Sequence, residues 1–144
     1  PFEQPVPTAL APNDVCVLYL RGALFFASAH SLEGMLPPAS SARNSVVVLV
    51  LRETNELGST LIRFLERYAG DLSKSGGKLV LASVSDSLYG QLERTGLVHR
   101  LGEDSVHRRQ AAMGASLNEA VVEARAWIER NTQGRETAIN SIQL

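Results

Sequence analysis

Val46-Val-Val-Leu-Val-Leu-Arg52 is a continuous apolar run rich in β-branched residues, and the loop Glu53-Thr-Asn-Glu-Leu-Gly58 and a helical pattern from Ser59 follow it. Such a run predicts a strand that is buried on both faces of a sheet, so Val48 and Leu49 should point to opposite faces. A buried strand followed closely by an amphipathic helix is half of a β-α-β unit. Their connecting loop lies where open α/β sheets place functional sites, but it contains no group that does covalent chemistry by itself. This favours a binding or regulatory module over an enzyme.

Length and composition exclude several classes of protein. The 144 residues correspond to one domain, and the net charge of −1 argues against non-specific binding of nucleic acid. The single cysteine, Cys16, excludes an internal disulfide, fits a reducing compartment and is best explained as a small core residue. The chain contains no apolar run of about 18 residues, so we expect no membrane-spanning helix in it. The chain opens at Pro1 without Met or a basic segment, so we expect a piece of a longer protein without a signal peptide.

Predicted strands and helices alternate along the chain. Strands are expected at residues 15–21, 46–52, 78–83 and 97–101, and helices at residues 28–36, 59–74, 85–96 and 116–130. This alternation predicts an α/β fold with a single domain over residues 15–130, built on a small mixed or mostly parallel β-sheet flanked by helices. Residues 1–14 hold four of the six prolines and predict a linker, with a short edge strand at residues 6–9. Residues 102–114 are expected to form a polar loop, and residues 131–144 a flexible C-terminal tail or linker.

The predicted helices carry apolar faces and end signals. The apolar positions are Leu61, Leu65, Tyr68 or Ala69 and Leu72 in the second helix, Leu88 and Leu92 in the third, and Leu117, Val121, Ala124 and Ile128 beside Trp127 in the last. Ser85 is expected to cap the third helix, which ends at Gly96. Ser116 and Glu119 form a capping-box pattern that predicts the start of the last helix.

The most suggestive candidate site is the loop between the central strand and its helix. Its residues are Thr54, Asn55, Glu56, Gly58, Ser59 and Thr60. The free N–H groups and positive dipole end of a helix N-terminus attract anions, and the serine and threonine hydroxyls could accept phosphate. Ordinary capping, with Ser59 as N-cap and Gly58 as a turn residue, explains the same pattern. Glu53 and Glu56 would also repel an anionic ligand.

Other motifs give weaker signals. Phe25 and Phe26 follow a predicted strand, and a ring left exposed there would mark a docking surface. Residues 99–109 include two histidines and three arginines that could contact an acidic partner or anionic lipid. Ser75-Gly-Gly-Lys78 lacks the spacing of a phosphate-binding loop and precedes a strand. No set of residues has zinc-ligand spacing or a nucleophile-elbow pattern, so we expect no metal, no cofactor and no enzymatic activity.

Four segments together resemble the STAS domain, named for sulfate transporters and anti-sigma factor antagonists. They are Leu20-Arg-Gly-Ala-Leu-Phe-Phe-Ala-Ser-Ala29, the strand and loop Val46 to Gly58, Gly77-Lys-Leu-Val-Leu-Ala-Ser-Val84, and Gln91-Leu-Glu-Arg-Thr-Gly-Leu97. The resemblance covers residues 15–130 in unbroken order. The Phe-Phe-Ala segment is similar to the STAS domains at the C-terminus of bacterial SulP-type anion permeases.

The resemblance implies a regulatory and assembly domain of a secondary transporter for sulfate, bicarbonate or a related anion, at the cytoplasmic face of the inner cell membrane. Its implied partner is the transmembrane domain of the same permease, with a homodimer as a further possibility. The fragment itself would neither insert into the membrane nor bind nucleic acid. A free-standing anti-sigma factor antagonist or a nucleotide-sensing switch is the alternative. Antagonist members carry a phosphorylated serine directly before the loop glycine, where this chain has Leu57, and Asn55 stands where an aspartate is usual.

Overall fold

A computed structural model describes residues 9–20, 34, 36–112 and 114–142 of the chain, with side chains up to residue 132. Its strands are β1 (Val15–Tyr19), β2 (Val46–Val50), β3 (Lys78–Val84) and β4 (Val106–Arg108). Its α-helices are α2 (Ser59–Lys74), α3 (Asp86–Arg94), α4 (Leu97–Leu101) and α5 (Ala115–Ile142), and two short 3-10 helices are η2 (Ala39–Ser41) and η3 (Glu103–Ser105).

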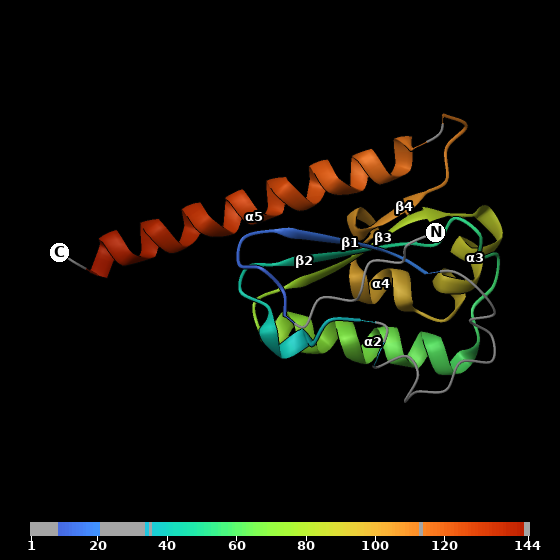
Figure 1. The fold of residues 1–144 in the computed structure, drawn as a ribbon, viewed down its shortest axis with the longest axis horizontal. Coiled ribbons are helices and arrows are strands. Elements are labelled where there is room, and N and C mark those ends of the chain that lie inside the picture. The colour runs from blue at the N-terminus through green and yellow to red at the C-terminus, as the bar shows by residue number, and fades with distance from the viewer. Residues whose placement is uncertain (1–8, 21–33, 35, 113, 143–144) are drawn as a thin grey trace.

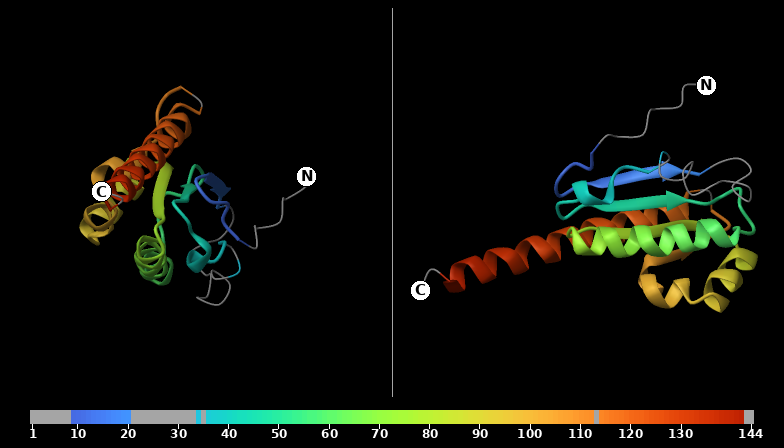
Figure 2. Two further views of the ribbon diagram at one scale, coloured as in Figure 1. Left: turned by 90° about the vertical axis from the view of Figure 1, so that its left-hand side faces the viewer. Right: turned by 90° about the horizontal axis from the view of Figure 1, so that it is seen from below.

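The four strands form one sheet in the order β1-β2-β3-β4, and every neighbouring pair is parallel. Val48 in the central strand pairs with Val17 of β1 and Val80 of β3. Because parallel neighbours need crossover connections, α2 joins β2 to β3, and α3 and α4 join β3 to β4. These helices cover one face of the sheet and α5 covers the other, as Figures 1 and 2 show. The predicted α/β fold is confirmed, with a sheet that is wholly parallel in the described residues.

The central strand is buried on both faces, as the sequence predicts. Val46, Val48 and Val50 pack in a cluster with Ala124 of α5. The alternate residues Val47, Leu49 and Leu51 belong to a larger cluster formed with α2, α3 and α4. Val48 and Leu49 are both fully buried, so the side chains of this strand supply the core of both layers.

The second and third helices follow their predicted patterns. Helix α2 spans the predicted residues 59–74, and its buried face includes every leucine expected there together with Ile62 and Phe64. In α3 the Ser85 side chain accepts a hydrogen bond from the Leu88 N–H at 3.1 Å, which confirms the predicted cap. Gly96 has a φ of 84°, in the left-handed region that favours glycine, so the chain turns sharply after α3.

The prediction of a short strand at residues 97–101 is wrong, because these residues form helix α4. Leu97 and Val98 are buried against the larger cluster, so a single helical turn places both apolar side chains where a strand would have separated them. The fourth strand instead lies within residues 102–114, which the sequence predicted as a polar loop. Strand β4 has only three residues, too few to show a period, and it is held by pairing with β3.

The last helix differs from its prediction at both ends. It begins at Ala115, so Ser116 lies inside the first turn and is not the N-cap of a capping box. Its buried residues include Ala120, which the pattern missed, whereas Val121 is only half-buried. It continues to Ile142, where a tail was expected from residue 131, and its last turns extend beyond the sheet (Figure 1). That residues 131–144 link to another part of a longer protein stays a prediction.

Several expectations concern residues outside the described part. These are the edge strand at residues 6–9, of which only Ala9 is described, the helix at residues 28–36, of which only Gly34 and Leu36 are described, and the docking candidates Phe25 and Phe26. The described end of the predicted linker lies against the domain. Leu10 is buried, and the Asn13 N–H donates to the Arg43 carbonyl at 2.9 Å.

Candidate functional site

The candidate site is the loop of residues 51–58, which joins β2 to α2 at the carboxyl end of the central strand. The N–H of Leu51 donates to the Ala82 carbonyl of β3 at 3.0 Å, so the start of the loop is fixed to the sheet. The Thr54 N–H then donates to the Leu51 carbonyl at 3.2 Å and closes a tight turn. From there the chain reaches Gly58, the residue directly before α2.

The structure brings the six predicted site residues together around this loop. Asn55, Glu56, Ser59 and Thr60 are exposed, while Thr54 and Gly58 are half-buried. Gly58 itself is the N-cap of α2, so the expectation that Ser59 caps the helix is wrong. The φ of Gly58 is −69°, an ordinary extended conformation, and no side chain of the described residues caps the helix. Within the described part, the first N–H groups of α2 therefore have no side-chain acceptor.

Leu57 anchors the loop. Its side chain is only 1% exposed and belongs to the larger core cluster. Its N–H donates to Gln91 Oε1 at 2.8 Å, and its carbonyl accepts from Gln91 Nε2 at 2.7 Å. Gln91 lies on α3, so one side-chain amide joins two connections of the sheet. Sequence reasoning missed Gln91, because a half-buried glutamine within a helix carries no pattern that names its partner.

The chemistry available in the loop is that of a contact surface. The exposed carboxylates of Glu53 and Glu56 lie in the loop before α2 and repel an anion, which opposes the attraction of the helix dipole. No group of three His, Cys, Asp or Glu side chains in the described residues is placed to hold a metal ion. The loop thus offers exposed polar and charged groups on a rigid base.

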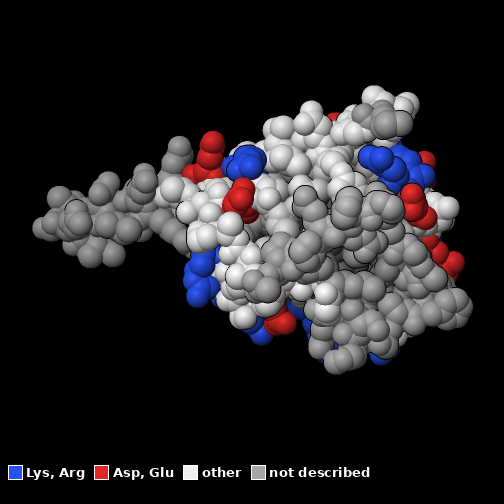
Figure 3. Space-filling model, in the orientation of Figure 1, with Lys and Arg blue, Asp and Glu red and all other residues white. Residues whose placement is uncertain are grey.

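The basic residues at 99–109 do not form one surface. His99 and Arg100 lie on α4, where Arg100 is 3.9 Å from Glu66 of α2. Arg108 pairs with Asp86 at 2.8 Å and stacks on the ring of Tyr89 at 4.4 Å. Positive and negative side chains also lie close together on the face drawn in Figure 3. Arg100 and Arg108 are thus each partly neutralised by a carboxylate of the domain, which weakens the case for an extended basic patch.

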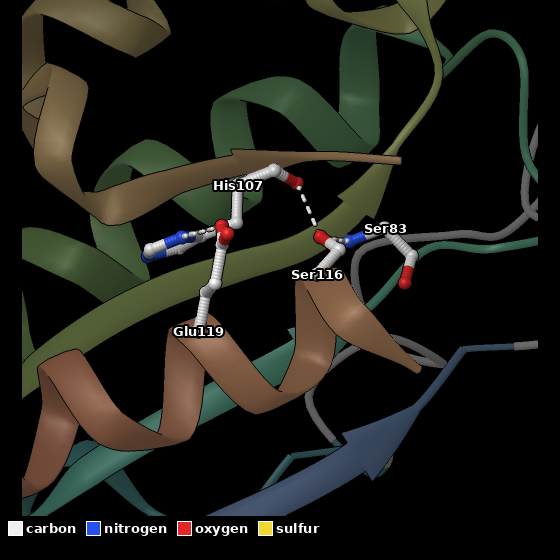
Figure 4. A network of polar contacts seen from close by, with 4 residues as sticks. All are labelled: Ser83, His107, Ser116 and Glu119. Atoms are coloured by element: carbon white, nitrogen blue, oxygen red, sulfur yellow. Dashed lines mark hydrogen bonds and ion pairs between the residues drawn. The ribbon is translucent and has the colours of Figure 1, made fainter. Parts of the chain in front are cut away.

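His107 belongs instead to a network under the start of α5 (Figure 4). The Ser116 hydroxyl accepts from the Ser83 N–H at 2.8 Å and donates to the His107 carbonyl at 3.1 Å. His107 Nδ1 lies 3.8 Å from Glu119 Oε2, a contact that becomes an ion pair when the imidazole is protonated. Ser83 has a φ of 58°, unusual for a residue other than glycine, at an irregularity in the pairing of β3 with β4. The network holds this irregular backbone against α5.

Cys16 gives no support for thiol chemistry. It lies half-buried in β1 against the larger core cluster, as the sequence led us to expect. Burial, and after it the nearby Asp14 carboxylate, raises the pKa of the Cys16 thiol. Because the thiolate is the nucleophile, this environment makes the side chain less reactive.

Comparisons with known proteins identify the family. The sequence model of the STAS domain matches residues 7–111, about three quarters of the chain, so this chain belongs to the STAS domain family. The match ends before α5 begins. No curated protein sequence matches significantly.

Two solved structures are similar. One is a sulfate transporter family protein from Wolinella succinogenes, 27% identical, with a TM-score of 0.64 over 88% of this chain and 99% of that chain. The other is the STAS domain of a SulP transporter from Vibrio cholerae, 24% identical, with a TM-score of 0.58 over 81% of this chain and 88% of that chain. The second likeness shows the shared fold. No helix in the described part of this chain is long and apolar enough to cross a membrane.

Proposed function

We propose that this STAS domain is the cytoplasmic regulatory and assembly module of a SulP-type permease for sulfate, bicarbonate or a related anion, and that it has no catalytic activity. In this account the β2–α2 loop contacts the transmembrane domain of the same protein, which selects the anion. Family membership supports the proposal, as does the likeness to the Wolinella succinogenes sulfate transporter family protein.

One observation favours the loop as the docking surface. The buried Leu57 and its two hydrogen bonds to Gln91 hold the loop in one conformation, while Asn55 and Glu56 are exposed beside it. A contact surface held in this way loses little conformational entropy when a partner binds.

The alternative functions have less support from the same loop. An antagonist switch would use a serine at the position of Leu57, and this leucine has no hydroxyl and is buried. A nucleotide sensor would place phosphates at the uncapped start of α2, where Glu53 and Glu56 oppose them. Ser59 and Thr60 remain exposed hydroxyls, so a phosphorylated form of either residue would revive the switch.

Anion uptake by the full-length protein tests the proposal. Glu56→Lys should lower the uptake of labelled sulfate or bicarbonate, while the melting temperature of the isolated domain stays the same, because charge reversal on an exposed loop changes stability by at most about 0.5 kcal/mol. Glu129→Lys on the exposed side of α5 is the matched control and should transport normally. Normal uptake by both Glu56→Lys and a Gly58→Asp variant would exclude the loop as docking surface.

A further inference from the structure

A small cavity lies between α2 and residues 36–39. Its volume is about 300 Å³, at the lower end of the range for small-molecule sites. Phe64 and Tyr68 of α2 form its aromatic side, with ring centroids 6.0 Å apart and planes inclined by 16°. Leu36, Pro37 and Pro38 form the facing side. The interior is therefore suited to an apolar group.

The cavity is built from fixed parts. The Tyr68 hydroxyl donates to the Pro37 carbonyl at 2.6 Å, which ties the facing side to α2. Two consecutive prolines, Pro37 and Pro38, restrict the backbone there because each ring fixes its φ. Since the Tyr68 proton is already used, recognition of a polar ligand group has to come from other side chains.

Two charged side chains of opposite sign, both exposed, complete the described lining. Arg67 and Asp71 lie one turn apart on α2, and both contribute to the cavity. Within the described residues neither forms an ion pair, with each other or with a third group, whereas the neighbouring Glu66 lies 3.9 Å from Arg100. The cavity thus presents one unpaired guanidinium and one unpaired carboxylate beside an apolar interior.

We propose that this cavity binds a small zwitterion with an apolar body, the chemistry of an apolar α-amino acid. The ligand carboxylate would bind the guanidinium of Arg67, its ammonium group the carboxylate of Asp71, and its apolar side chain the rings of Phe64 and Tyr68. A simple apolar anion meets repulsion from Asp71, and a simple apolar cation meets repulsion from Arg67. This inference is independent of the permease proposal.

Binding can be measured by titrating the isotope-labelled 144-residue chain with L-phenylalanine and following its amide resonances. Saturable shifts should gather at the amides of Leu36, Ala39 and residues 64–71. Two analogues test the class of ligand: 3-phenylpropionate lacks the ammonium group, and 2-phenylethylamine lacks the carboxylate. Each should bind about two- to fivefold more weakly than phenylalanine, the change expected from loss of one exposed charge pair.

Substitutions of Arg67 and Asp71 test which group of the ligand each side chain binds. Arg67→Gln should weaken binding of phenylalanine and 3-phenylpropionate by about two- to fivefold and leave 2-phenylethylamine no weaker, and Asp71→Asn should show the converse. Arg63→Gln, one turn earlier on α2 and outside this cavity, is the control and should bind all three compounds normally. Absence of saturable shifts near the cavity, equal affinity for the three compounds, or a loss in Arg63→Gln equal to that in Arg67→Gln would each overturn the proposal.

Discussion

The side-chain amide of Gln91 brackets the backbone of Leu57, accepting from its N–H at 2.8 Å and donating to its carbonyl at 2.7 Å. Both groups belong to a residue whose side chain is buried. Backbone groups in such a place need partners, because an unsatisfied buried group costs about 1–3 kcal/mol. Gln91 meets this need and fixes the loop that we propose as the docking surface.

Replacement of Gln91 by Glu should therefore destabilise the domain by about 1–3 kcal/mol at pH 7, because a carboxylate cannot donate to the Leu57 carbonyl. Near pH 4 a protonated Glu regains a donor, so the difference from wild type at the same pH should shrink. Urea unfolding at the two pH values measures both effects. Gln110→Glu on the exposed loop is the control. An unfolding free energy within about 0.5 kcal/mol of wild type at pH 7 would show that the bracket is not important for stability.

Leu65→Ala tests the packing of α2 on the sheet. Leu65 is fully buried, so deletion of its side chain should cost about 2–5 kcal/mol. Val122→Ala on α5, where the side chain is 62% exposed, should change stability by less than about 0.5 kcal/mol. Denaturant unfolding compares the two variants. If Leu65→Ala lowers the free energy of unfolding as little as Val122→Ala does, the assignment of the buried face of α2 is wrong.

Ser116→Ala tests the link between α5 and β3. The Ser83 N–H would lose its acceptor in a buried place, so we expect a loss of about 1–3 kcal/mol. Hydrogen exchange at the Ser83 amide should become faster than in wild type by more than the change in global stability accounts for. Ser87→Ala on the exposed side of α3 serves as the matched variant and should leave that amide unaffected. Unchanged exchange at Ser83 in Ser116→Ala would argue against this hydrogen bond.

Ionisation of Tyr68 should lower the stability of the domain at alkaline pH. Burial, followed by the charge of a nearby Cys16 thiolate, raises the pKa of Tyr68 above its ordinary value. The neutral phenol is thus favoured in the folded state. Its contribution to the free energy of unfolding is fully present below about pH 10, the pKa of tyrosine in the unfolded chain. As the pH rises further the unfolded chain loses the Tyr68 proton first, so stability falls. The stability advantage of wild type over Tyr68→Phe should narrow above about pH 10 in urea unfolding. A constant difference up to pH 11 would mean that Tyr68 ionises equally in both states.

The sequence predicts the parts of the fold that carry long periodic signals. The bounds of α2, the burial of Val48 and Leu49 on opposite faces, and the Ser85 cap follow from spacing alone, because each depends on residues close together in the chain. Elements of three to five residues are different. Residues 97–101 fit one strand or one helical turn equally well, and the deciding factor is where Leu97 and Val98 reach the core.

The candidate site is likewise predictable from the sequence only in part. Its position at the end of β2 follows from the buried strand and the helix after it. That the six residues at 54–60 form a binding site stays a prediction. The role of Gln91 could not be predicted, because its partner Leu57 lies in a different connection of the sheet. Ser116 illustrates the same limit. Its pattern favours a cap, but tertiary contacts with Ser83 and His107 use its hydroxyl instead.

We propose above that the β2–α2 loop contacts the membrane-embedded part of the same permease. A photo-reactive amino acid in place of the exposed Glu56, in the full-length protein in native membranes, tests this most directly. We expect a cross-link from position 56 to a peptide of the transmembrane domain, and no such product from a photo-reactive group at the exposed Glu129. Capture of a separate soluble protein from position 56, with no cross-link to the transmembrane domain, would show that the loop docks elsewhere.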